Sequence, residues 1–197
     1  MPLNLLDSGF PLSLTSLSSK MMQNTLITRF NEFSYFSSIT TLGYARDNNA
    51  TSFYGCTSLE QINLQNITYI AGGTGTGNVG SPLRSTALVE ISIPNITKLA
   101  QYAFYNYQDG SKKQGLLERI TIGDKFTTIS NQYAFTYLYM ASIKILTTTP
   151  ATGSTLNSSG RNNNFIYVPD ESVENYKSAA AWANWKNYIK PLSECPW

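Results

Sequence analysis

Hydrophobic residues recur at fixed offsets through the middle of the chain. Three stretches share one pattern, TSLEQINLQNITYI, TALVEISIPNITKL and GLLERITIGDKFTTI, and begin at Thr57, Thr86 and Gly115. In each, a leucine is followed three and five positions later by aliphatic residues. Side chains two residues apart share one face of a strand. Each stretch therefore predicts a short strand with one buried face and one polar face.

The pattern is an internal repeat. Its first leucines, Leu59, Leu88 and Leu117, are equally spaced along the chain. SIKILTTTP is a fourth, weaker copy, in which we place Ile143 in the leucine position, followed by Leu146. One unit buries too few side chains to offset the entropy of ordering its backbone, so such units are stable only when they stack. We therefore expect these leucines and Ile143 to form one internal column.

The N-terminal end of such a stack needs a cover. Apolar residues recur there at every third position: Phe30, Phe33, Phe36, Ile39 and Leu42. This spacing predicts a degenerate first coil whose aromatic rings close the open end of the core.

The C-terminal end predicts a capping helix. Pro169 precedes Asp170, which we expect to be the N-cap residue, and Glu171 and Glu174 suit the positive end of a helix. One face of this helix is apolar and would cover the last coil: Val173, Tyr176, Ala180 and Trp182, continued by Trp185, Tyr188 and Ile189.

A second recurring element is an Ala-Phe pair, in QYAFYN at Ala103 and in QYAFTY at Ala134, and Phe53 lies in the same phenylalanine position before Leu59. With Cys56 and Pro94, these residues resemble the BspA-type (Treponema-like) leucine-rich repeats. The segment NFIYVPDESVENYKSAAAWANWKNYIKPL is similar to the ending of that family. The resemblance extends over about residues 30–192.

The repeat and this resemblance imply a β-rich solenoid. We expect a right-handed leucine-rich-repeat coil of four to five repeats, with short strands, irregular or short helical turns and a C-terminal capping helix. The expected divisions of the chain are an extension at 1–24, an N-terminal cap at 25–50, repeats at 51–168, the capping helix at 169–192 and a tail at 193–197. Residues 25–192 would form a single domain.

Composition argues against catalysis. The chain contains no histidine, which removes the commonest general base and the commonest zinc ligand. Its two cysteines have no metal-binding spacing; we expect Cys56 to be a buried thiol, and a bridge to Cys195 stays open. We therefore expect no enzyme activity, no cofactor and no metal.

Charge and hydropathy restrict the partners. A formal net charge of +2 gives little attraction for nucleic acid, and no apolar run approaches the ~20 residues that cross a bilayer. The first residues lack the basic start of a signal peptide. We expect either an excerpt of a longer exported chain or a protein that uses another route.

Two motifs suggest chemistry that their context does not favour. GTGNVG, from Gly75 to Gly80, matches a dinucleotide fingerprint, but Pro82 follows and no helical pattern comes next, so we interpret it as a surface loop. Glu60, Glu90 and Glu118 lie on adjacent coils and suggest a glycosidase pair. Glu90 shares a column with Gln61 and Arg119, however, which predicts a Glu90–Arg119 charge pair on a solvated face.

The polar strand face is the main binding candidate, formed by Gln61, Asn63, Glu90, Ser92, Arg119, Thr121 and Thr147. Loop candidates are Tyr105, Tyr107 and Asn78. We expect a non-catalytic module that binds a protein or a glycan. The family resemblance implies adhesion at a bacterial cell surface, outside the cell.

A structural or receptor-binding protein of a Bacteroidetes phage virion is the alternative. The start of the chain and its low charge with richness in Asn, Thr and Tyr motivate it, and so does the resemblance, because BspA-like repeats are also similar to modules in phages of the same bacteria. In that setting the chain would belong to a larger assembly.

Overall fold

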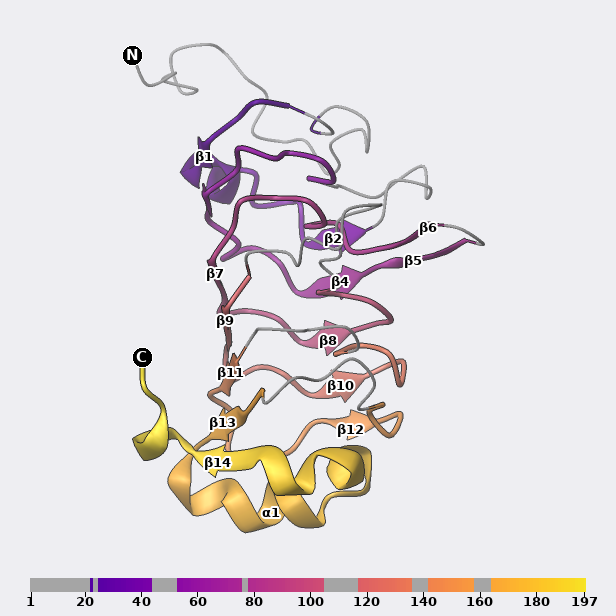
Figure 1. The fold of residues 1–197 in the computed structure, drawn as a ribbon, viewed down its shortest axis with the longest axis vertical. Coiled ribbons are helices and arrows are strands. Elements are labelled where there is room, and N and C mark those ends of the chain that lie inside the picture. The colour runs from indigo at the N-terminus through magenta and orange to yellow at the C-terminus, as the bar shows by residue number, and fades with distance from the viewer. Residues whose placement is uncertain are drawn as a thin grey trace.

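The computed structural model describes residues 22, 25–43, 53–75, 78–104, 117–135, 142–157 and 164–197. This part of the chain is mainly parallel β-sheet with few helices (Figure 1). The predicted extension at 1–24 lies outside the described residues except for Met22.

Two five-stranded parallel sheets run side by side along the molecule (Figure 1). The first sheet has the order β12-β10-β8-β4-β2 and the second β14-β13-β11-β9-β7; both are open. Strands of the first sheet are β2 (Thr41–Gly43), β4 (Tyr69–Ala71), β8 (Lys98–Leu99), β10 (Thr128–Ile129) and β12 (Thr152–Gly153). Strands of the second are β7 (Glu90–Ile93), β9 (Arg119–Ile122), β11 (Ser142–Ile145), β13 (Ile166–Val168) and β14 (Ile189–Pro191).

From β7 to β13 the chain visits the two sheets alternately, so each coil there adds one strand to each sheet, and side chains from both sheets meet in a shared core. In the second sheet, one inward column is a single ladder of isoleucines: Ile91, Ile120, Ile143, Ile166 and Ile189. All five are buried. The three predicted leucines, Leu59, Leu88 and Leu117, are buried as expected.

The predicted place of Ile143 in the repeat is wrong by three residues. Ile143 pairs with Ile120 rather than standing in the column of Leu117. Ile143 and Ile145 are both buried in β11, whereas Leu146 is 43% exposed. Because a strand alternates its faces, the burial of Ile143 and Ile145 sets this register.

The apolar residues of the predicted first coil are buried, as the spacing predicts. β1 (Arg29–Phe30) pairs with β3 (Gln61–Ile62), and the 3-10 helix η1 (Asn31–Tyr35) leads on to β2. All five apolar residues of the spacing are buried: Phe30, Phe33, Phe36, Ile39 and Leu42. The rings of Phe33 and Phe53 meet edge to face with centroids 5.3 Å apart, so aromatic packing joins this coil to the next.

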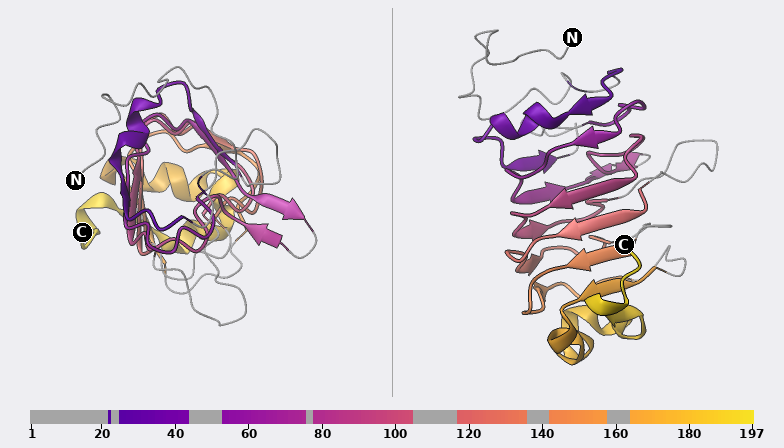
Figure 2. Two further views of the ribbon diagram at one scale, coloured as in Figure 1. Left: turned by 90° about the horizontal axis from the view of Figure 1, so that it is seen from above. Right: turned by 90° about the vertical axis from the view of Figure 1, so that its left-hand side faces the viewer.

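Short helices cover the C-terminal end, as the right panel of Figure 2 shows. They are η2 (Asp170–Ser172), α1 (Val173–Ser178) and η3 (Ala180–Tyr188), whereas η4 (Leu192–Glu194) follows β14 and lies against β13. Tyr176 and the indoles of Trp182 and Trp185 are buried as predicted. The Tyr176 hydroxyl donates to the Thr147 carbonyl at 3.0 Å, and burial raises the pKa of Tyr176.

Three details of the predicted cap are wrong. Asp170 lies inside η2 and caps no helix; its Oδ1 accepts the N–H of Ser193 at 3.0 Å, and hydrogen bonds from Ser193 lower the pKa of Asp170. Ala180 is exposed. Ile189 begins β14, which adds a further strand to the second sheet, so the helical cap ends at Tyr188 rather than at 192.

The glycine-rich segment forms an antiparallel hairpin of β5 (Gly73–Gly75) and β6 (Asn78–Gly80), which projects from the coils in the left panel of Figure 2. Residues 81–88 contain no helix. This agrees with a surface loop and leaves the dinucleotide motif without the helix that phosphate binding requires.

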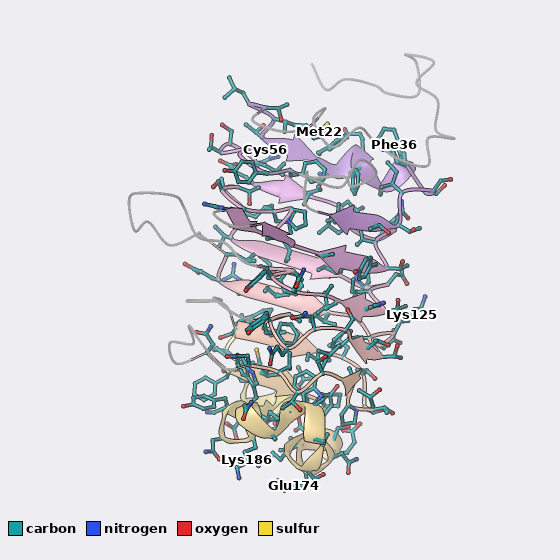
Figure 3. The ribbon with its side chains drawn as sticks, turned by 90° about the vertical axis from the view of Figure 1, so that its right-hand side faces the viewer. Met22, Phe36, Cys56, Lys125, Glu174 and Lys186 are labelled. Atoms are coloured by element: carbon teal, nitrogen blue, oxygen red, sulfur yellow. The ribbon has the colours of Figure 1, made fainter. Side chains whose placement is uncertain are left out.

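Both cysteines are free, and Cys56 is buried as predicted. Its thiol donates to the Met22 carbonyl at 2.6 Å near the N-terminal end, far from Glu174 and Lys186 on the terminal helices (Figure 3). Within the described ranges, no helix is long and apolar enough to cross a membrane.

Candidate functional site

The outer face of the second sheet carries the polar positions of the repeat. One column contains Glu90, Arg119 and Ser142, and the next contains Ser92, Thr121, Lys144, Tyr167 and Lys190. Arg119 Nε donates to Glu90 Oε2 at 3.0 Å, so the predicted charge pair is confirmed. The pair is partly exposed and ties two neighbouring coils together on this face.

We call the boundary between neighbouring strands of successive coils a seam. Backbone hydrogen bonds join β7 to β9 along their whole length, so this seam is closed. The Arg119 N–H donates to the Val89 carbonyl at 3.1 Å, and the Gly123 N–H donates to the Ile93 carbonyl at 3.1 Å. The seam between β9 and β11 is closed in the same way, by Ser142 to Glu118 at 2.8 Å and Leu146 to Ile122 at 3.0 Å. A donor just after each strand is therefore part of the repeating pattern.

The seam between β3 and β7 is open. β3 pairs with β1, and no ladder joins it to β7 in the described part of the chain. Pro94 occupies the position of Gly123 one coil earlier and has no N–H to donate to the Leu64 carbonyl. On the other side of the same coils, β4 pairs with β8, so the first sheet stays continuous. We call this gap in the second sheet's stack the open seam.

A groove of ≈ 550 Å³ lies along the open seam. Its lining comes from β3, β7, the turns beside them and the first residue of η1: Asn31, Glu60, Gln61, Ile62, Asn63, Leu64, Gln65, Glu90, Ile91, Ser92 and Pro94. Ile62 is only half-buried, whereas Ile91 and Ile120 are buried. The opening therefore exposes part of the core column as well as two strand edges.

Acidic and amide side chains dominate the polar lining of this groove. Its side chains include two carboxylates, Glu60 and Glu90, and four carboxamides, but no lysine, arginine or aromatic ring. One acceptor is already engaged, since Asn63 Oδ1 accepts the Gln65 N–H at 3.1 Å. Among the residues that the structure describes, the Glu60 carboxylate has no hydrogen-bond or ion-pair partner.

Four of the predicted face residues line the groove together, namely Gln61, Asn63, Glu90 and Ser92. Arg119 and Thr121 lie on the next strand, β9, outside it. Asn78 belongs to β6, in register with Gly75 of the hairpin. Tyr105 and Tyr107 fall outside the described residues.

Thr147 is not part of this face. It follows β11, is only 8% exposed, and its hydroxyl accepts the Thr149 N–H at 3.2 Å. Its predicted position depends on that of Ile143, and both are wrong by three residues. Ser142 and Lys144 hold the corresponding outward positions, and the alternation SIKI was the signal for them.

The C-terminal part of the same face is covered. Lys144 donates to the Trp197 carbonyl, and its ammonium lies 4.0 Å from the centroid of the Trp197 indole. Lys190 pairs with Glu194 at 3.3 Å. Tyr167 is only 5% exposed, and this burial raises its pKa. The N-terminal part of the face is thus the accessible one.

No group of three or more Cys, Asp or Glu side chains within the described ranges could hold a metal ion. No protein-family model matches the chain, and no curated protein matches it.

Proposed function

We propose that the chain is a non-catalytic recognition module that binds a protein or glycan partner at the open seam. In this proposal the fold is a leucine-rich-repeat solenoid of the BspA type, and the resemblance favours a role in adhesion at a bacterial surface. The observation that carries the proposal is a polar groove at the one break in an otherwise continuous stack of described coils.

The solenoid assignment is supported by the alternation of strands between two parallel sheets. In the isoleucine column, the interval from Ile91 to Ile120 is the longest, and Ile120, Ile143, Ile166 and Ile189 follow one another at a shorter, constant interval. A short standard repeat, extended in some coils by an insertion, explains both intervals. Insertions in repeat proteins map to surface loops, which leaves the strand face regular.

The binding role is supported by the size and chemistry of the groove. The volume of the groove, ≈ 550 Å³, lies within the range of about 300–1,000 Å³ that ligand pockets of proteins have. The first sheet supplies the scaffold because it stays paired behind the groove. A non-catalytic role is favoured because Arg119 engages the Glu90 carboxylate and the chain has no histidine.

Binding to glycan and peptide arrays tests this function when three proteins are compared. The seam variant is Gln61→Ala with Asn63→Ala; the control is Thr121→Ala with Ser142→Ala, on the same face but outside the groove. We expect ligands of the wild type to lose about tenfold in affinity in the seam variant. The control variant keeps its affinity. Ligands that bind both variants equally would remove the open seam as the site.

A further inference from the structure

We infer that the open seam receives an arginine side chain carried by an extended segment of a protein partner. This inference rests on the proposed binding role and names the chemistry of the partner. It follows from the acceptors that the seam leaves unused, from the charge of its lining and from the absence of aromatic rings in it.

Main-chain acceptors are left open at both ends of the seam. The Ile93 carbonyl accepts two N–H groups, from Ile96 and from Gly123 of the next coil. Its counterpart at the open seam, the Leu64 carbonyl, accepts the Ile67 N–H at 3.1 Å and, in the described coils, no second donor. The Leu64 carbonyl can therefore accept a second hydrogen bond from a donor outside the chain.

The same contrast holds at the other end of the strands. The Val89 carbonyl accepts the N–H groups of Glu118 and Arg119, at 2.8 and 3.1 Å. The corresponding Glu60 carbonyl has no backbone donor among the residues that the structure describes. The seam thus presents two carbonyls whose equivalents in the next coil are satisfied by the protein itself.

The charge of the groove favours a cation. Glu60 and Glu90 line it, and no basic side chain does; because Arg119 already pairs with Glu90, the Glu60 carboxylate is the negative charge of the lining that a cation would meet. A guanidinium has five N–H donors in a plane and no acceptor, which suits a site made of carbonyls, carboxylates and amide oxygens. Arg119 already shows such an arrangement on this face, since its Nε donates to Glu90.

A polypeptide fits the groove better than a glycan. Sugar rings commonly pack on aromatic side chains, and none lines this groove. The carboxamides of Asn31, Gln61 and Gln65 stand along its length, where they can pair with the main-chain amides of an extended segment. The half-buried Ile62 adds an apolar contact for the methylenes of the arginine.

The test is an amide NMR titration with two capped tripeptides, Ala-Arg-Ala and Ala-citrulline-Ala. Citrulline keeps the shape of arginine without its charge. We expect saturable shifts at Leu64, Glu90 and Ser92 with the arginine peptide, and about tenfold weaker binding of the citrulline peptide. Glu60→Gln should weaken the arginine peptide about threefold.

Glu118→Gln is the matched control, because Glu118 holds the position of Glu60 at a closed seam and lies outside the groove. It should leave the affinity unchanged. Equal binding of both peptides, or no saturable shift at the seam, would overturn the inference. If array glycans bind in a seam-dependent way while the arginine peptide does not, the proposed function stands and the arginine partner is wrong.

Discussion

The open seam and the closed seam beside it are built from equivalent parts. Ile62, Ile91 and Ile120 hold the same position in successive coils at equal intervals along the chain, yet only the β7–β9 seam is paired. The seams differ at several positions, and one difference acts directly on a backbone hydrogen bond: Pro94 at the open seam, Gly123 at the closed one. Proline has no N–H, whereas glycine donates to Ile93 and lets β9 come close.

This contrast teaches that one repeat pattern serves two purposes. Closed seams satisfy the strand edges and bury the isoleucine column. The open seam leaves edge groups and part of Ile62 accessible, while pairing of β4 with β8 keeps the coils together. Pro94 accounts for one absent hydrogen bond, at the Leu64 carbonyl; at the other end of the seam the Glu60 carbonyl also lacks a backbone donor among the described residues, although Val89 and Glu90 each have an N–H.

The largest expected difference between the seams is in the stability of the core column. Ile120→Ala should cost about 2–5 kcal/mol, because Ile120 is buried and its loss leaves a cavity. Ile62→Ala should cost about 1 kcal/mol, since Ile62 is half-buried. Urea unfolding measures both. Equal losses would mean that Ile62 is as enclosed as Ile120 and that the seam is shut in solution.

The next largest effect is expected at Gly123, whose backbone lies close to that of Pro94 at the closed seam. A Cβ on Gly123 would lie 1.9 Å from the Pro94 carbonyl oxygen. Gly123→Ala should therefore force the two coils apart and destabilise the fold by about 1–3 kcal/mol. The exposed neighbour Asp124 provides the control, since Asp124→Ala should stay within about 0.5 kcal/mol. A tolerated alanine at 123 would place β9 farther from Pro94 than the structure does.

The smallest effect belongs to the surface charge pair. A double-mutant cycle of Glu90→Gln and Arg119→Gln should give a coupling energy of about 0.2–1 kcal/mol, because both side chains are partly exposed. The coupling should fall further in salt on the order of 1 M. A coupling that is large and independent of salt would show that this pair is buried.

Much of the fold was predictable because the residues that form its core recur at regular intervals along the sequence. The constant offset between the first repeats placed Glu90 opposite Arg119, and the regular spacing of phenylalanines located the first coil. Ile143 was misplaced because the coil that leads to it is shorter than the coils before it, which a search for equal spacings does not anticipate. Thr147 was misplaced with it.

Other features depend on contacts that no local pattern contains. Asp170 has the sequence of an N-cap, but its carboxylate is used by Ser193, far along the chain. Ile189 continues a helical pattern in the sequence, yet it pairs with Ile166 of β13 and so lies in a strand. Four groove residues were identified from their outward positions, whereas the groove itself was not, because the hydrophobic pattern runs unbroken past Pro94.

Amide hydrogen exchange measured by NMR tests the open seam most directly. One column of the outer face contains Glu90, Arg119 and Ser142. The N–H groups of Arg119 and Ser142 donate to carbonyls of the preceding coil. In the described structure, the N–H group of Glu90 has no acceptor in the coil before it. We predict that the Glu90 amide exchanges at least about 100-fold faster than the Arg119 and Ser142 amides. Equal protection of all three amides would contradict the account.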